Sequence, residues 1–219
     1  MITVGIIDSG LSESIAREVS VKTRDFSGSA TTWDTLGHGT VISQVIAAAQ
    51  PDRILMAKVF DTQLSCPSKA VIDALAWLSD LNTDVINMSF GMRRADPALA
   101  SAVSHYISGG GVIIASSPAQ GDSVYPAGFD GVIRATGDAR ATPNTWVWLN
   151  SRQADFGAYV GERSHGVVGA SVGCAWMTHH WIRTLREHPR CPIAATKQRL
   201  IDTAVARGPE CFPRPATHA

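Results

Sequence analysis

Three residues of complementary chemistry lie far apart in this sequence. They are the carboxylic acid Asp8, the imidazole His38 and the hydroxyl Ser171. A serine hydroxyl is a poor nucleophile at neutral pH unless a neighbouring base takes its proton. Histidine titrates near neutrality and can take and return that proton, while a buried carboxylate fixes the histidine tautomer. The three types together predict nucleophilic acyl transfer, with Ser171 attacking, His38 moving the proton and Asp8 orienting His38.

The rest of the chain predicts the elements that position these residues. Short apolar runs rich in β-branched residues are typical of strands buried on both faces, and helix-like stretches follow them. This alternation predicts an α/β fold, a three-layer sandwich with a mostly parallel sheet and helices on both faces. The expected strands are Ile2–Ile7, Ile54–Val59, Val85–Met88, Val112–Ala115 and Val132–Ala135. The expected helices are Thr40–Ala49, Ser68–Leu81, Asp96–Ile107, Ser171–Leu185 and Ala194–Val205.

Local signals mark several boundaries of these elements. Ser68 and Asp96 are expected N-caps, and Gly109–Gly111 stop the helix that ends near Ser108. Tryptophans alternate with Val147, which is typical of a strand. The 219 residues suit one domain over 1–207, followed by a proline-containing irregular tail over 208–219.

The predicted topology brings the three chemical residues to one edge of the sheet. Sites in parallel α/β sheets gather at the carboxyl ends of strands, and Asp8 directly follows the first strand. Gly37 and Gly39 flank His38 and allow a tight turn. Ser171 begins a helix, where free N–H groups favour developing negative charge.

Five segments, in this order, resemble the subtilase family of serine peptidases. The order aspartate, histidine, serine is the subtilase order. The resemblance covers nearly the whole chain and implies a subtilisin-like fold and a serine endopeptidase that acts through an acyl-enzyme. The matching segments are Ile6–Gly10, Gly37–Thr40, Val85–Gly91, Tyr125–Gly137 and Gly169–Ala175.

The resemblance also implies which residues bind substrate. Ser89, Phe90 and Gly91 are expected to pair with the substrate backbone as an added strand. The segment Ser116, Ser117 and Pro118 is expected to wall the primary specificity pocket.

The segment after the fourth expected strand departs from the subtilase pattern. Subtilases place an asparagine side chain in the oxyanion hole, and ungapped alignment puts Ala119 at that position. Loss of one such donor typically lowers turnover by about 10²–10³. We expect the neighbouring Gln120 to act as substitute donor.

Composition and spacing limit the partners of the chain. Formal net charge is zero, with 19 basic and 19 acidic residues, which predicts no binding of nucleic acid. No apolar run approaches the ~20 residues that span a bilayer, and no spacing predicts a metal site or a cofactor. The N-terminus lacks a secretory signal, and four cysteines without ligand spacing suggest free thiols, so we expect a cytoplasmic protein. A Cys191–Cys211 bridge stays open.

Short length and the altered oxyanion segment narrow the resemblance to dedicated processing peptidases. It implies a peptide or protein substrate that bears a leader segment, such as the γ subunit of bacterial quinohemoprotein amine dehydrogenase. Two alternatives stay open. One is a pseudo-peptidase that binds an extended peptide but cleaves it poorly, and the other is a nucleotide- or phosphate-dependent α/β enzyme that uses Asp8.

Overall fold

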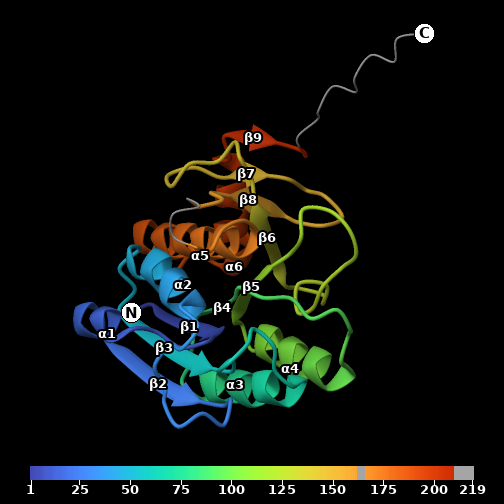
Figure 1. Ribbon diagram of the computed structural model, residues 1–219. Helices are drawn as coiled ribbons and strands as arrows, with labels where there is room; N and C mark the ends of the chain where they lie inside the picture. The colour runs from blue at the N-terminus through green and yellow to red at the C-terminus, as the bar shows by residue number, and fades with distance from the viewer. Residues whose placement is uncertain (162–165, 210–219) are drawn as a thin grey trace.

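The computed structural model describes residues 1–161 and 166–209, and these residues form an α/β fold (Figure 1). One mostly parallel sheet contains nine strands in the order β2-β3-β1-β4-β5-β6-β8-β7-β9, with β7 antiparallel to β8. The predicted fold class is confirmed. The strands are β1 (Thr3–Asp8), β2 (Val21–Asp25), β3 (Arg53–Lys58), β4 (Val85–Met88), β5 (Val112–Ser116), β6 (Ile133–Gly137), β7 (Val147–Trp148), β8 (Phe156–Ala158) and β9 (Ala206–Arg207).

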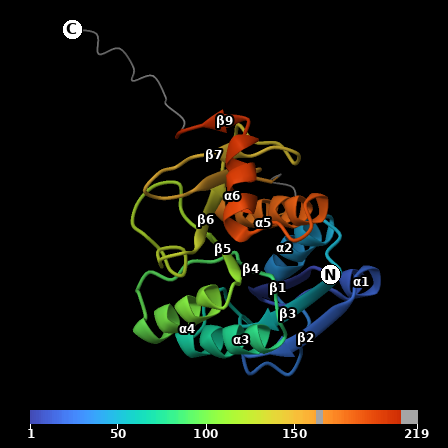
Figure 2. The same cartoon turned by 180° about the vertical axis from the view of Figure 1, so that it is seen from behind.

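Helices cover both faces of the sheet, as Figure 2 shows from behind. Alternate residues of β1 point to opposite faces. Val4 and Ile6 belong to the core cluster that includes residues of α1, α2, α5 and α6, whereas Ile7 belongs to the cluster that includes residues of α3 and α4. The helices are α1 (Glu13–Glu18), α2 (His38–Ala47), α3 (Ser68–Asp80), α4 (Pro97–Ser108), α5 (Ala170–Glu187) and α6 (Ile193–Asp202).

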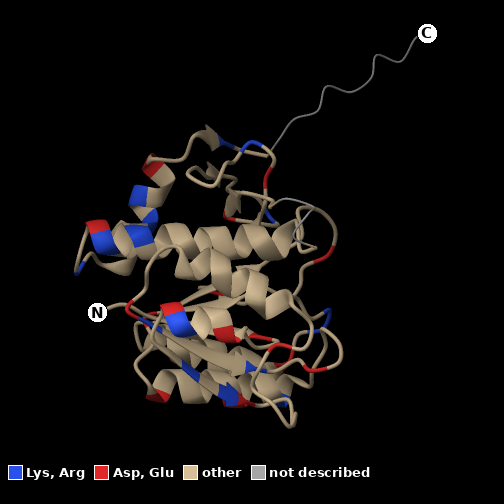
Figure 3. Cartoon of the chain, turned by 60° about the vertical axis from the view of Figure 1, so that its left-hand side comes forward, with Lys and Arg blue, Asp and Glu red and all other residues tan. Residues whose placement is uncertain are grey.

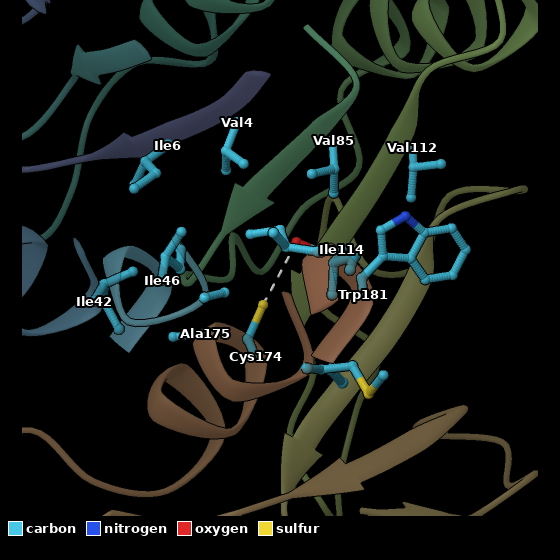
Figure 4. Packing of buried hydrophobic residues seen from close by; sticks show 14 of the residues in the cluster. Val4, Ile6, Ile42, Ile46, Val85, Val112, Ile114, Cys174, Ala175 and Trp181 are labelled. Atoms are coloured by element: carbon cyan, nitrogen blue, oxygen red, sulfur yellow. Dashed lines mark hydrogen bonds between the residues drawn. The ribbon is translucent and has the colours of Figure 1, made fainter. Parts of the chain in front are cut away.

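The core between the sheet and α2 and α5 is assembled from both halves of the chain. Figure 4 shows Ile42 and Ile46 of α2 and Cys174 and Trp181 of α5 facing the strands. The thiol of Cys174 lies 3.4 Å from the carbonyl oxygen of Ile114. Burial raises the pKa of this thiol to about 12, so Cys174 is a core residue, as its place in the sequence predicts.

Most predicted elements occur within one to three residues of their expected bounds, and β4 matches its run fully. Asp96 is the N-cap of α4 and accepts hydrogen bonds from the backbone N–H groups of Ala98 and Leu99. The prediction for Ser68 is wrong, because Ser68 is the first residue of α3 and Pro67 holds the N-cap position.

Four elements had no signal in the apolar pattern, among them β8, which has three residues. The edge strand β2 alternates half-buried and exposed residues, so it carries no apolar run. Helix α1 has six residues and buries only Ile15, and β9 has two residues. Of the expected tail, residues 210–219 lie outside the described residues.

Two glycines let helices approach the backbone at the carboxyl edge of the sheet. A Cβ on Gly39, in the first turn of α2, would lie 2.1 Å from the carbonyl oxygen of Gly10. A Cβ on Gly173 of α5 would lie 2.3 Å from the carbonyl oxygen of Thr136 in β6. Gly37, at φ 80°, makes the tight turn that precedes His38. Both helices therefore start in contact with the strand ends.

We expect Gly173→Ala to destabilise the fold by about 1–3 kcal/mol, because the added methyl group must push α5 away from β6. Urea unfolding followed by circular dichroism would measure the loss. Gly109→Ala is the matched control, since its Cβ would meet its nearest neighbour at 3.4 Å and its φ is −74°. Equal stability of the two variants would contradict the close packing of α5 on β6.

Candidate active site

A buried hydrogen bond joins Asp8 to His38 at the carboxyl edge of the sheet. Asp8 is the last residue of β1 and is fully buried, and His38 is the first residue of α2 and is 7% exposed. Asp8 Oδ1 lies 2.7 Å from His38 Nδ1. An ionised carboxylate there requires the hydrogen on Nδ1, which leaves Nε2 as the nitrogen able to accept a proton.

A second carboxylate holds the loop that presents His38. Asp34 accepts hydrogen bonds from the backbone N–H groups of Leu36, Gly37 and Thr40 and from the Thr40 hydroxyl, at 2.6–3.0 Å. The hydroxyl of Ser9 donates to Asp34 and accepts from the N–H of Gly39. Asp34 thus fixes the loop that presents His38, in addition to the effect of its charge on the imidazole.

The net effect of the surroundings is to favour the charged form of His38. Burial is the largest single influence and lowers the pKa of His38. The hydrogen bond to Asp8, the charge of Asp8 and the charge of Asp34 together outweigh burial, so the pKa of His38 is raised. Such an imidazole readily holds the proton that a nucleophile must release.

Ser171 is the second residue of α5 and is held against the segment that follows β4. Its hydroxyl donates a 2.8 Å hydrogen bond to the carbonyl oxygen of Ser89, and the Ser89 hydroxyl lies 3.0 Å from the carbonyl oxygen of Ser171. Within the described part of the chain, no hydrogen bond joins the Ser171 hydroxyl to His38. The hydroxyl is therefore turned toward Ser89 in this structure.

One cleft of about 780 Å³ contains both His38 and Ser171. The predicted backbone-binding residues Ser89, Phe90 and Gly91 line the same cleft. The structure thus brings five of the predicted site residues to one cavity, and Asp8 lies directly behind His38.

The other predicted residues do not line this cleft. Ser116 and Ser117 are buried, and the Ser117 hydroxyl donates to the carbonyl oxygen of Gln153 at 2.6 Å. Gln120 is exposed and lines a separate hollow of about 210 Å³ with Thr136. Pro118 is half-buried. An ungapped alignment of the sequence that starts from β5 placed these residues. Such an alignment carries no information on the path of the loop after the strand.

The N-terminus of α5 offers an unpaired donor next to the Ser171 hydroxyl. Gly169 is the N-cap residue, and the N–H of Gly173 already donates to the Gly169 carbonyl. Among the described residues, the N–H of Ser171 has no acceptor. First-turn N–H groups of this kind, reinforced by the helix dipole, stabilise negative charge.

The described residues contain no group of three or more histidine, cysteine and acidic side chains placed to hold a metal ion. None of the helices in residues 1–161 and 166–209 is long and apolar enough to cross a membrane. Cys66, Cys174 and Cys191 are free thiols, and Cys211 lies outside the described residues. His179 and His180 are buried packing residues on α5, in ring contact with Trp176.

Comparison with known sequences gives one consistent result. A family model described as the subtilase family, Peptidase S8, matches residues 1–130, which include Asp8 and His38. Subtilisin DY of Bacillus licheniformis is 33% identical over 149 residues, covering 60% of this chain and 54% of its own length. Subtilisin of Bacillus pumilus is 28% identical over 236 residues, covering 94% of this chain and 85% of its own length. The chain thus spans little more than half of the first relative.

Solved structures show the same fold at low identity. A cold-adapted subtilisin-like serine proteinase matches with a TM-score of 0.68 at 19% identity, over 90% of this chain and 80% of its own. A lanthipeptide protease matches with a TM-score of 0.67 at 16% identity, over 90% of this chain and 77% of its own.

We expect Asp8→Asn to lower the pKa of His38, because the substitution removes the charge that opposes burial. NMR titration of the histidine rings would measure the shift. The exposed His105 on α4 serves as the internal control. An unaltered pKa at His38 would contradict the role of Asp8 given above.

Proposed function

The chain belongs to the subtilase family, and on that premise we propose that it hydrolyses peptide bonds through an acyl-enzyme formed on Ser171. The observation that carries this proposal is the buried Asp8–His38 hydrogen bond in the wall of the cleft that also contains Ser171. The three side chains come from β1, α2 and α5, so only the folded sheet edge assembles them.

The proposed reaction begins with rotation of the Ser171 hydroxyl from Ser89 toward His38 Nε2. A peptide that pairs with Ser89–Gly91 supplies an N–H for the Ser89 carbonyl, which releases that hydroxyl. Ser171 Oγ then bonds to the scissile carbonyl carbon while its proton passes to His38. Asp8 holds the Nδ1 hydrogen throughout and stabilises the imidazolium.

Collapse of the tetrahedral intermediate breaks the carbon–nitrogen bond, and His38 returns its proton to the leaving amine. A water molecule, activated by His38, then hydrolyses the ester on Ser171. An oxyanion forms both when the acyl-enzyme is made and when it is hydrolysed. In each step it accepts a hydrogen bond from the N–H of Ser171. Gln120 stays our prediction for the second donor, which requires its exposed side chain to reach the cleft in the complex.

The proposed substrate is a single leader-bearing protein rather than protein in general. The absent oxyanion asparagine predicts slow turnover, which one dedicated substrate tolerates. Solved proteins of similar fold include a lanthipeptide protease and a prenylagaramide maturation protease, and this likeness is one of fold. We propose the γ subunit of bacterial quinohemoprotein amine dehydrogenase as that substrate, and the cytoplasm as the location.

We expect a fluorophosphonate probe to label Ser171, because a serine activated by an adjacent base attacks phosphorus readily. Intact mass and peptide mapping would locate the adduct. Labelling should fall at least 100-fold in His38→Ala, which lacks the base, while His105→Ala on α4 should label normally.

Other results of the labelling experiment favour the alternatives. Binding of extended peptides without labelling of Ser171 would favour the pseudo-peptidase. Magnesium- or phosphate-dependent activity that survives in Ser171→Ala would favour an enzyme that uses Asp8 for phosphate chemistry.

We expect incubation with the leader-bearing γ subunit to release its leader in one cut, measured by intact mass. Ser171→Ala is the control and should leave the mass unchanged. The γ subunit without its leader should also stay intact. An uncut γ subunit, with normal fluorophosphonate labelling, would contradict this substrate but not the peptidase activity.

A further inference from the structure

We propose that Arg93 and Arg94 make this cleft selective for substrates with an acidic side chain a few residues from the scissile bond. This inference rests on the proposed function and names the substrate class of the same site. Both arginines line the cleft that contains His38 and Ser171, and both are exposed.

The two guanidinium groups have no partner among the described residues. Neither makes a hydrogen bond or an ion pair with another described side chain or backbone group. Five other arginines do pair with carboxylates, namely Arg17, Arg134, Arg140, Arg183 and Arg186. The cleft therefore presents positive charge that the chain itself leaves uncompensated.

The loop that carries the arginines is anchored at both ends. Met92 exchanges two backbone hydrogen bonds with Tyr125, at 2.7 and 2.8 Å. Asp96 is fixed as the N-cap of α4. Only Arg93, Arg94 and Ala95 lie between these anchors, so binding costs little backbone entropy there.

The acidic residue that lines the cleft with the arginines already has hydrogen-bond partners. Asp96 lines the same cleft, but its carboxylate accepts hydrogen bonds from two N–H groups of α4. A hydrogen bond from Ser68, and then those N–H groups, lower the pKa of Asp96. Its charge therefore faces the helix N-terminus, and two arginines against one acid leave the cleft net positive.

Apolar side chains also line the cleft. Phe60 and Phe90 pack edge to face at 5.2 Å between centroids, and Leu64 beside them is 53% exposed. An extended peptide advances about 3.3 Å per residue. Arg93 and Arg94 follow Ser89 by four and five positions in the chain, so we place the carboxylate about three to five residues from the bond at Ser171. Guanidinium forks bind carboxylates through two parallel hydrogen bonds.

The test compares peptides that differ only in charge. A library of fluorogenic octapeptides carries Asp or Glu at one position, and a matched library carries Asn or Gln there. We expect the full chain to cleave the acidic members with about tenfold higher kcat/KM at one or two positions. Raising the ionic strength should shrink this preference.

Substitution assigns the preference to the arginines. In Arg93→Gln/Arg94→Gln, acidic and amide peptides should be cleaved within about twofold of each other. Lys22→Gln/Arg24→Gln removes two exposed charges from the edge strand β2 and should retain the preference. An acidic preference that persists without both arginines, or no preference in the unsubstituted chain, would overturn the inference.

Binding separates this inference from the proposed function. Fluorescence anisotropy of labelled acidic and amide peptides on Ser171→Ala reports affinity without cleavage. Tighter binding of acidic peptides that needs both arginines, together with no cleavage by the unsubstituted chain, would support the inference and refute the peptidase. Cleavage and binding that do not depend on peptide charge would support the peptidase and refute the inference.

Discussion

The whole site depends on a carboxylate that is removed from water at the end of the first strand. A buried charge is costly unless hydrogen bonds and an opposite charge compensate for it. Asp8 receives the backbone N–H of Ser9 and the ring of His38 on one oxygen, each at 2.7 Å. The close contact of Gly39 with the loop after β1 keeps the His38 end of α2 in place. Strand, loop and helix therefore all position the hydrogen bond between Asp8 and His38.

The nucleophile is positioned by a second, independent contact between distant parts of the chain. The charged residues of α5 all lie near its C-terminal end, as Figure 3 shows, so its first three turns can be buried. Those turns pack on the sheet and bring Ser171 to Ser89 at the end of β4. Because α2 and α5 pack against each other in the same core, the base and the nucleophile are carried by one rigid layer.

Sequence reasoning located a residue correctly where its position follows from the end of a buried element. Asp8 after an apolar run and Ser171 at a helix start are such positions, and the structure places both at the carboxyl edge. Edge strand β2 escaped prediction because Lys22 and Arg24 face solvent. Asp34 was not recognised, since its role depends on loop hydrogen bonds that no periodicity reports.

Of the residues that the resemblance placed, Ser89–Gly91 line the cleft, whereas those after β5 do not. Gln120 and the segment Ser116–Pro118 follow β5, and the chain there enters a long connection to β6. Side chains in such a connection are directed by distant contacts, such as the hydrogen bond from Ser117 to Gln153. Arg93 and Arg94 were missed for the same reason, because their loop is fixed by the backbone pairing of Met92 with Tyr125.

Remote contacts and a reduced oxyanion hole are physically compatible in one enzyme. Binding energy from parts of the substrate far from the reacting bond can be used to orient that bond, and such contacts raise turnover only when the correct substrate supplies them. We propose that Ala119 stands in place of the oxyanion asparagine, so that the chain lacks a donor that would serve every substrate equally. Its discrimination then shifts to the cleft, where charge selects the peptide before the hydroxyl of Ser171 is released from Ser89. A peptide that lacks the matching carboxylate would lose both affinity and alignment, which is the behaviour that a dedicated processing enzyme requires.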